Sequence, residues 1–355
     1  MYFKHRLFGF FFNIFRKFPL KNNRISFVID SNGSFKGNFD YIHKEFQKRG
    51  NFQYNFFLKD KLNINSLYKL ATSKYIFLND NFFPMAFMNF KKETKVIQLW
   101  HAPGAFKKFG ASLTSNKSEV QMINKINQKV NYLITTSDNI KDFYADAFQI
   151  DLDKIKAFGI PRVDYYFENH DINRLRENFN DKYPLAKDKK LILYAPTFRD
   201  NTEYNNVFNY LDLKKFNDSL SKEYVLVLRL HPKINNSFSD DSSFINCTDY
   251  KNEQELLLLA DILITDYSSI MIEYAILDKP IFFFVYDLDS YDRGFYIDFE
   301  EFVPGKIVKN TDDLINAIKE DNYNKGKNHS FLKTQFNTLD GKASERIVDF
   351  LMNNE

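Results

Sequence analysis

Cysteine is almost absent from this chain, because its 355 residues include a single one, Cys247. An internal disulfide and a zinc site built from cysteines are therefore excluded, and one thiol fits a reducing compartment such as the cytoplasm. An excess of one charge is also missing, since 49 Lys and Arg residues oppose 46 Asp and Glu residues and leave a formal net charge of +3. No large basic field therefore indicates a nucleic acid as a partner.

The motifs of several common enzyme classes are missing. The chain contains no GxxxxGKS/T, no GxGxxG after an expected strand, no HExxH, no CxxC and no GxSxG. NTPases, Rossmann oxidoreductases, zincins and hydrolases of the usual types would lack their core residues here. The histidines outside the motifs described below show no ligand spacing; they are His5, His43, His170 and His329. We expect neither a metal nor a cofactor.

A long hydrophobic run is missing too. Residues 1–23 form a basic and aromatic segment, but its apolar stretch Leu7–Phe15 is far shorter than the roughly 20 residues of a transmembrane helix. No small-residue cleavage site follows, so we do not expect a cleaved signal peptide. If the segment is helical, one side carries Phe8, Phe11, Phe12, Phe15 and Phe18. This pattern fits a helix lying in a membrane interface and equally a helix packed on its own protein.

The chain is long enough for two domains, and its β-rich runs alternate with helical patterns. This alternation predicts an α/β fold with two doubly wound domains of mainly parallel strands and a cleft between them. We expect the domains at 24–165 and 189–330, a linker or crossing helix at 166–188 and a C-terminal helix within 331–355. Strands are expected at 24–30, 52–58, 74–80, 95–101, 130–137, 154–164, 190–196, 223–232, 243–249, 261–269 and 280–287. Helices are expected at 39–50, 64–73, 137–150, 212–220, 252–260, 268–278, 310–320 and 343–353.

Ligands of open α/β sheets bind beyond the carboxyl ends of the strands, so we examined the residues that follow each expected strand. "TDYSSI" at 265–270 is the clearest case, because Ser268 and Ser269 open a helix directly after a strand. Two hydroxyls and free backbone N–H groups at a helix N-terminus favour a phosphate. The alternative is ordinary N-capping, with Glu273 facing solvent.

Three further strand ends carry charged residues. In "RLHP", Arg229 and His231 lie on the same side of a strand that Pro232 ends, so together they could neutralise a phosphoryl oxygen. A structural histidine is the alternative. "APTFRD" offers Thr197 and its backbone after Pro196, with Arg199 and Asp200 as an expected ion pair, or an ordinary turn. "GIPRVD" offers Arg162, which is either a ligand-binding residue or a surface arginine at a hinge.

The fifth strand end, "WHAPG" at 100–104, suggests acid–base chemistry. Pro103 and Gly104 predict a tight turn that holds His101 open to a ligand. A neutral imidazole with a pKa near 7 is suited to take a proton from an attacking hydroxyl. Lys107 and Lys108 would attract an anionic acceptor. The alternative is that Trp100 packs in the core and the lysines are solvated.

Taken in order, "QLWHAPGAFKKFG", "FGIPRVD", "ILYAPTFRD", "RLHP" and "ITDYSSIMIEYAILDKPIFFF" resemble the CDP-glycerol glycerophosphotransferase family of teichoic acid primases and polymerases. The resemblance covers about Lys95–Val308. It implies a GT-B fold with two Rossmann-like domains, action on a CDP-activated polyol phosphate and release of CMP. It also implies peripheral attachment to the cytoplasmic face of the cell membrane.

The resemblance also implies roles for single residues. His101 falls on the general base of the family's WHG-type motif, and His231, with Arg229, falls on the residues that stabilise the diphosphate. Nucleotide or phosphate contacts are implied for a further set, namely Arg162, Pro196, Thr197, Ser268 and Ser269, and Glu273 is expected near the ribose or glycerol hydroxyls. The turn itself departs from the family pattern, because Trp100 and His101 are followed by Ala102, Pro103 and Gly104. The backbone approach to phosphate is therefore expected at Gly104.

These implications lead to one expected activity. The chain would transfer glycerol phosphate from CDP-glycerol to a hydroxyl of a membrane-associated teichoic acid or capsule-type acceptor, such as a lipid-linked glycan or polyol phosphate. The same chemistry with CDP-ribitol or another CDP-polyol is the alternative. A GT-B glycosyltransferase that uses a nucleotide sugar and a catalytically silent membrane scaffold are more distant alternatives.

Overall fold

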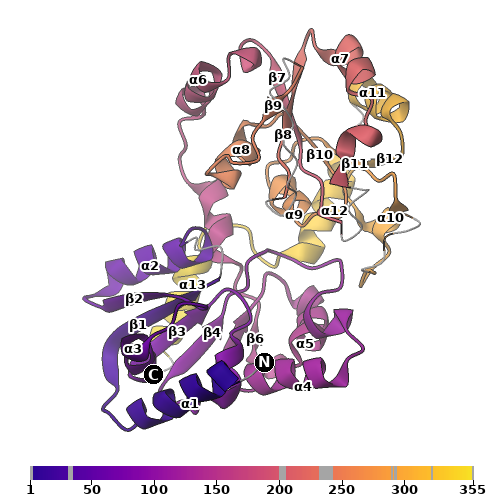
Figure 1. Ribbon diagram of the computed structural model, residues 1–355. Helices are drawn as coiled ribbons and strands as arrows, with labels where there is room; N and C mark the ends of the chain where they lie inside the picture. The colour runs from indigo at the N-terminus through magenta and orange to yellow at the C-terminus, as the bar shows by residue number, and fades with distance from the viewer. Residues whose placement is uncertain are drawn as a thin grey trace. The chain divides into compact units, whose positions relative to one another are not determined.

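The computed structural model describes residues 3–30, 35–199, 205–231, 243–288, 291, 294–320 and 323–353. The chain forms two compact units, the first from residues 1–167 together with 334–355 and the second from residues 168–333. Each unit contains one six-stranded sheet whose paired strands are all parallel (Figure 1). The expected α/β fold with two doubly wound sheets is confirmed.

The sheet of unit 1 has the strand order β2-β1-β3-β4-β5-β6. Its strands are β1 (Lys21–Ile29), β2 (Gln53–Leu58), β3 (Ser73–Leu78), β4 (Lys95–Gln98), β5 (Tyr132–Ile134) and β6 (Ile155–Lys156). Most are short runs of buried apolar residues, because a parallel sheet is covered by helices on both faces. The chain order reverses between β1 and β3, and the carboxyl ends of all six strands lie at one edge.

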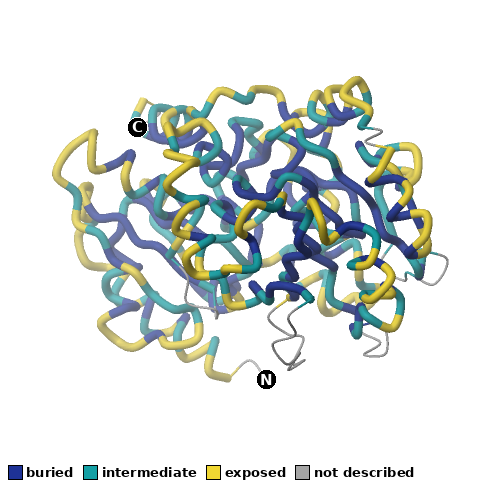
Figure 2. The backbone as a smooth tube through the Cα atoms, turned by 90° about the horizontal axis from the view of Figure 1, so that it is seen from above, coloured by how far each residue is buried: buried dark blue, intermediate teal, exposed yellow. Residues whose placement is uncertain are grey.

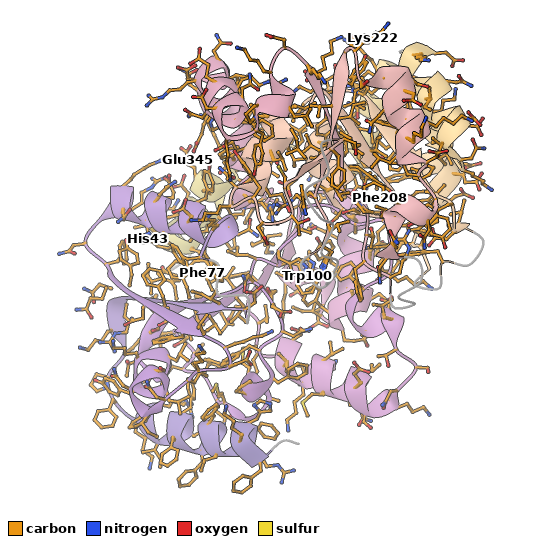
Figure 3. All side chains as sticks on the ribbon, turned by 45° about the horizontal axis from the view of Figure 1, so that its top comes forward. His43, Phe77, Trp100, Phe208, Lys222 and Glu345 are labelled. Carbon is orange, nitrogen blue, oxygen red and sulfur yellow. The ribbon has the colours of Figure 1, made fainter. Side chains whose placement is uncertain are left out.

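Two sets of helices cover this sheet. One face packs against α2 (Asn38–Arg49) and the C-terminal helix α13 (Ala343–Asn353). The other face packs against α1 (Phe3–Phe15), α3 (Ile64–Ala71), α4 (Lys117–Asn127) and α5 (Lys141–Phe148), together with the 3-10 helix η1 (Phe83–Phe87). In Figure 2 the strands run as buried segments between partly exposed helices. Phe77 of β3, labelled in Figure 3, belongs to the face under α2 and α13.

Helix α1 packs on its own protein with the face that carries Phe8, Phe11, Phe12 and Phe15. The side chain of Phe12 is 1% exposed, and the other three pack against the same core cluster. Gly9 allows the close approach, because a Cβ at this position would lie 2.5 Å from the Cβ of Phe87. Of the two alternatives for this face, packing on its own protein is the one that the structure shows, with η1 and α3 as its main contacts. Within the described residues, no helix is long and apolar enough to cross a membrane.

The sheet of unit 2 has the strand order β12-β11-β10-β7-β8-β9. Its strands are β7 (Lys190–Tyr194), β8 (Tyr224–Leu228), β9 (Ile245–Asn246), β10 (Ile262–Thr265), β11 (Ile281–Phe284) and β12 (Lys306–Val308). Counted along the chain, this is the order of a dinucleotide-binding sheet, and the order reverses between β7 and β10. The crevice for a ligand is expected at this reversal, beyond the carboxyl ends of those two strands.

The helices of unit 2 are α6 (Ile172–Lys182), α7 (Leu213–Leu220), α8 (Glu253–Leu259), α9 (Ile270–Ala275), α10 (Phe299–Phe302), α11 (Thr311–Glu320) and most of α12 (Lys325–Gln335). Helices α7 and α11 cover one face of the sheet. Helix α6 falls within the segment expected as a linker and packs against α8. The chain returns from unit 2 to unit 1 within α12.

Not every expected element formed. The strand expected at 154–164 is reduced to the two residues of β6, because Gly159 adopts a left-handed φ of 88° and a 3-10 helix, η5 (Pro161–Phe167), begins at the next proline. Strand β12 and helices α4, α10 and α12 were not expected from the sequence. Helix α13, in contrast, has the expected bounds.

The buried carboxylate of Asp164 holds the start of α13. Its oxygens accept hydrogen bonds from the backbone N–H groups of Ala343 and Ser344, each at 2.9 Å, and from the Ser344 hydroxyl at 2.6 Å. Burial raises the pKa of Asp164, although these hydrogen bonds act to lower it. The last residue of the "GIPRVD" motif therefore connects η5 to the C-terminal helix.

We expect Asp164→Ala to lower the free energy of unfolding by about 1–3 kcal/mol, because it leaves donors at the start of α13 without an acceptor. Urea unfolding monitored by circular dichroism measures this change. Asp151→Ala is the control, because Asp151 is exposed and makes no side-chain capping bond. Equal stability of the two variants would contradict this role of Asp164.

Candidate active site

The turn that follows β4 begins at Trp100, which has a left-handed φ of 58°. A bulky residue in this conformation is strained by roughly 1–3 kcal/mol and persists only where its surroundings fix it. The Trp100 N–H donates to Oε1 of Gln98 at 2.9 Å, and Nδ2 of Asn38 donates to the Trp100 carbonyl at 2.9 Å. The chain therefore turns earlier than Pro103 and Gly104 predicted, directly at the tryptophan (Figure 3).

Pro103 and Gly104 form the buried second half of the turn. Gly104 has a φ of 64°, and its N–H donates to Oγ1 of Thr136 at 3.2 Å. The Tyr144 hydroxyl donates to the carbonyl of Gly104 at 3.0 Å and to that of Ala102 at 3.5 Å. The turn is therefore built on protein contacts at each of its residues.

The side chain of His101 is exposed at this turn and lies against the Trp100 ring, with 4.1 Å between the ring centroids. Its Nδ1 lies 3.4 Å from the carbonyl oxygen of Asn79. A ring nitrogen that faces a carbonyl carries the hydrogen, so Nε2 is left as the basic atom. His101 can therefore accept a proton through Nε2.

The pKa of His101 is lowered from its ordinary value of 6.5. The main cause is the loss of water around the ring. The charge of Asp80 raises the pKa, whereas the charge of Arg162 lowers it further. The imidazole is thus neutral near pH 7, as the sequence analysis expected of a general base.

Arg162 and Asn38 hold the backbone of the turn that follows β4. Nη1 of Arg162 donates to the carbonyl of His101 at 3.0 Å. Asn38, which is buried, bonds the carbonyl of Trp100 and also accepts from the Arg162 N–H at 2.9 Å. The structure therefore brings Arg162 and His101 together. Sequence reasoning missed Asn38, because nothing in its own segment distinguishes it from other polar residues at a helix start.

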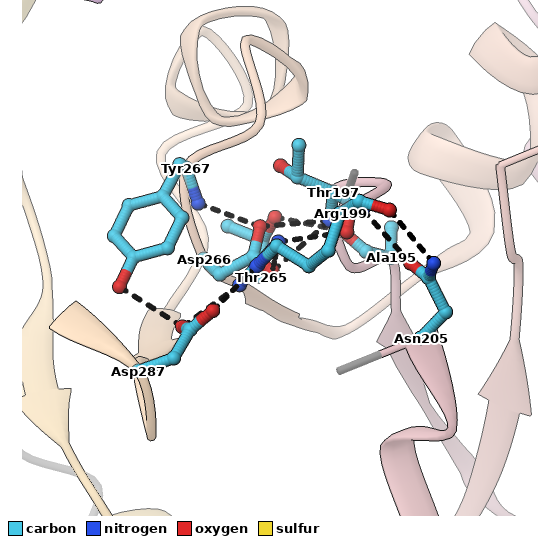
Figure 4. Close-up of polar contacts among 8 residues, drawn as sticks. All are labelled: Ala195, Thr197, Arg199, Asn205, Thr265, Asp266, Tyr267 and Asp287. Atoms are coloured by element: carbon cyan, nitrogen blue, oxygen red, sulfur yellow. Dashed lines mark hydrogen bonds and ion pairs between the residues drawn. The ribbon is translucent and has the colours of Figure 1, made fainter. Parts of the chain in front are cut away.

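In unit 2, a buried ion cluster joins the loops that follow β7, β10 and β11 (Figure 4). Arg199 is 5% exposed, and its guanidinium lies 2.9 Å from a carboxylate oxygen of Asp266 and 2.6 Å from one of Asp287. Burial alone would lower the pKa of Arg199, but the two carboxylates raise it. Asp200, the expected partner of Arg199, lies outside the described residues. Neither Asp266 nor Asp287 was identified from the sequence.

The same cluster positions Thr197 beside the loop after β10. The Thr197 N–H donates to both carboxylate oxygens of Asp266, at 2.8 and 3.0 Å. Its hydroxyl oxygen is buried and has no hydrogen-bond partner among the described residues. An unpaired buried hydroxyl costs about 1–3 kcal/mol, so this atom is available to a ligand. Pro196 precedes it as a buried residue.

Ser268 and Ser269 open helix α9 directly after β10, as expected. The Ser268 hydroxyl accepts from the Ile270 N–H at 3.4 Å, whereas the Ser269 side chain makes no capping bond. Glu273 is buried in α9, so the alternative in which it faces solvent is wrong. Thr197 and the two serines thus follow β7 and β10, the two strands at which the sheet order reverses.

Arg229 and His231 follow β8 but have different surroundings. The guanidinium of Arg229 donates to the carbonyls of Cys247, Thr248 and Tyr250 at 3.2, 3.4 and 3.0 Å and contacts Glu253 at 3.4 Å. It therefore fixes the segment after β9. His231 is exposed, and its ring centroid lies 5.7 Å from that of Phe198, beside Thr197. Pro232 lies outside the described residues.

Two other chemistries find no support in the described part of the chain. No group of three or more His, Cys, Asp or Glu side chains there could hold a metal ion. Burial raises the pKa of the Cys247 thiol to about 11, so it stays protonated and is a poor nucleophile at neutral pH. The candidate groups for chemistry are therefore His101 and His231 with the loops around them.

Comparison with known proteins gives a consistent result. The family described as CDP-Glycerol:Poly(glycerophosphate) glycerophosphotransferase matches residues 10–353. The chain is 39% identical to the teichoic acid poly(ribitol-phosphate) polymerase of Bacillus spizizenii, over 97% of this chain and 58% of the polymerase. It is 34% identical to the teichoic acid glycerol-phosphate primase of Bacillus subtilis, over 82% of this chain and 76% of the primase.

The fold of this chain matches that of a solved structure. A variant of the wall teichoic acid polymerase TagF, soaked with CDPG, matches with a TM-score of 0.83 and 26% identity, over 99% of this chain and 93% of that one. The expected GT-B type of fold is thereby confirmed. The chain spans 58% of the length of the poly(ribitol-phosphate) polymerase, so the activity of that whole protein does not transfer directly. The chain belongs to the CDP-glycerol:poly(glycerophosphate) glycerophosphotransferase family.

Proposed function

We propose that this chain transfers a polyol phosphate from a CDP-polyol to a hydroxyl of a teichoic acid or capsule-type acceptor and releases CMP. The observation that carries the proposal is the strained turn that presents a neutral His101. A family member needs a base for the acceptor hydroxyl, and His101 offers a basic Nε2 on a rigid support. Nucleotide-sugar transfer and a silent scaffold receive no such support.

In the proposed reaction, the acceptor oxygen attacks the β-phosphorus of the donor. A new O–P bond forms, the P–O bond to CMP breaks, and the acceptor proton passes to Nε2 of His101. His231, Ser268, Ser269 and the Thr197 hydroxyl would hold the diphosphate and stabilise the charge of the leaving CMP.

The remaining site residues have supporting roles in this proposal. Trp100 and Arg162 orient His101. Substrate contacts of Ala102, Pro103 and Gly104 stay predictions, and the Gly104 N–H already donates to Thr136. Arg229 orders the segment after β9 by donating to its backbone carbonyls, and a direct contact of Arg229 with phosphate stays a prediction. A contact of Glu273 with the ribose or glycerol hydroxyls also stays a prediction.

Two donors are candidates. The family description and the motifs of this chain favour CDP-glycerol. CDP-ribitol is favoured by the higher identity to the ribitol-phosphate polymerase than to the glycerol-phosphate primase, 39% against 34%. Both donors contain the same cytidine diphosphate, so the proposed roles of the histidines and of the diphosphate loops hold for either.

We also propose that α1 attaches unit 1 to the cytoplasmic face of the membrane. A second apolar stripe of this helix, formed by Phe3, Leu7, Phe10 and Ile14, faces away from the core, and Phe3 and Phe10 are 81% and 60% exposed. These residues recur every three or four positions and therefore share one side of the helix. Arg6 lies between Phe3 and Leu7 in the sequence, and Lys17 follows Ile14, so cations accompany the stripe as in helices that lie in a membrane interface.

We expect the purified chain to release CMP from CDP-glycerol or CDP-ribitol with a polyol-phosphate acceptor, and not to release nucleotide from UDP-sugars. His101→Ala and His231→Ala should each lower the turnover number by about 100-fold or more, because each removes an acid–base or charge-stabilising group. The control His329→Ala, in a histidine without a proposed role, should keep normal turnover. Near-normal release by either folded variant would refute its assigned role.

The pH dependence of kcat/KM should identify His101 as the base. The acidic limb should lie below pH 6.5, because the lowered pKa keeps the ring neutral down to that value. Arg162→Met removes a charge that lowers this pKa, so the limb should move to higher pH. Asp80→Asn removes a charge that raises it, so the limb should move to lower pH. Shifts in the same direction would contradict the assignment.

Vesicle flotation measures the attachment by α1. Phe10→Ser with Ile14→Ser should weaken binding to neutral phosphatidylcholine vesicles by about tenfold or more, since two apolar side chains no longer enter the interface. Leu113→Ser with Ile172→Ser is the control, because these residues are similarly exposed but lie outside α1. Equal binding by the two double variants would refute the proposal.

A further inference from the structure

A basic cavity of about 460 Å³ lies at the amino edge of the unit 1 sheet. Four of the residues that line it are cationic, namely Arg16, Lys91, Lys92 and Lys129. They come from three separate segments, which are the end of α1, the loop before β4 and the loop before β5. A cavity of this size accommodates a small ligand.

Nothing in the lining neutralises these cations. No Asp or Glu is among the residues that line the cavity. Within the described residues, none of the four forms an ion pair with a carboxylate; only the Nζ of Lys91 has a side-chain hydrogen bond, to the Phe18 carbonyl at 2.6 Å. Four like charges around one hollow repel each other, and an anion in the hollow would relieve this repulsion.

The polar lining is fixed by the sheet. Oδ1 of Asn131 accepts from the Val96 N–H at 2.8 Å, so its amide NH₂ group is the part left to donate. Thr94 is held by a hydrogen bond from its hydroxyl to the Ser73 carbonyl at 3.0 Å. The cavity therefore combines four cationic side chains with the fixed amide group of Asn131, which suits the oxygens of a phosphate.

The cavity is separate from the candidate active site. Thr94 immediately precedes β4, whereas His101 follows its carboxyl end. At about 3.3 Å per residue, the two ends of this segment lie roughly 20 Å apart. The proposed transfer reaction does not use the cavity.

We propose that this cavity binds the phosphate head group of an anionic membrane lipid. The inference deepens the membrane attachment proposed for α1 and rests on it. Arg16, in the lining, directly follows the helix that carries the exposed apolar stripe. Phe18, whose carbonyl holds Lys91, is itself 48% exposed.

Those apolar neighbours favour a lipid over a soluble polyanion. A lipid has a charged head group joined to an apolar body, so it matches a basic cavity that adjoins an exposed apolar stripe. A soluble polyol-phosphate chain has phosphates without such a body, and it would gain nothing from Phe18 or the stripe on α1. The arrangement therefore favours the lipid.

The test uses the full chain and the double variant Lys92→Gln with Lys129→Gln. Neither of these side chains makes a hydrogen bond within the described residues, so the substitution leaves the fold intact, and thermal unfolding verifies this. The control is Lys214→Gln with Lys222→Gln, which removes the same charge from the surface of unit 2 (Figure 3). The probes are vesicles of phosphatidylcholine with and without phosphatidylglycerol, and water-soluble dihexanoyl phosphatidylglycerol.

We expect wild type and control to prefer the anionic vesicles, and the cavity variant to lose roughly 10- to 30-fold of that preference while its binding to neutral vesicles is unchanged. It should also lose binding of the soluble short-chain lipid. Because this lipid is soluble, its binding tests the cavity even if α1 does not attach to vesicles. Equal losses by cavity variant and control would overturn the proposal, as would unchanged binding of dihexanoyl phosphatidylglycerol by the cavity variant.

Discussion

The parallel direction of all strands is the constraint on which the candidate sites depend. Because every paired strand in a unit runs the same way, all loops that leave carboxyl ends meet at one edge of the sheet. His101 follows β4, while Thr197 and Ser268 follow the two strands where the order of unit 2 reverses. The amino edge carries none of these groups, which is why a second, basic cavity there can serve another purpose.

Within unit 2, one buried arginine determines the shape of the donor-side loops. A buried guanidinium is costly unless carboxylates pair with it, and Arg199 meets this requirement through Asp266 and Asp287. The three residues belong to the loops after β7, β10 and β11, so neutralising one charge fixes three loops at once. The hydroxyl of Thr197 is left unpaired in this otherwise saturated network, and this is the arrangement expected where a ligand supplies the missing partner.

The sequence predicts which residues follow strand ends, because that depends on local order, while the roles of these residues stay predictions. The rule that ligands bind beyond strand ends led to His101, Thr197 and Ser268, because a strand followed by a polar turn is visible in a short segment. It missed Asn38 and Asp287, which act on residues 62 and 88 positions away along the chain, because only the folded sheet brings them there. The sequence predicted that Pro103 sets the turn. Instead the chain turns at Trp100, whose strained backbone is held by hydrogen bonds with residues outside the motif.

The sequence left the placement of α1 open for a different reason. Periodicity identifies an apolar stripe but does not say which stripe is buried when a helix has two. The sheet of unit 1 takes the side of Phe12, and Gly9 allows the approach, so the exposed stripe is the one headed by Phe3 and Phe10. A helix used on both sides stabilises the protein with one face and leaves the other for an interface. Because the packing face and the exposed stripe share no side chains, substitutions in the stripe can weaken attachment with little effect on stability.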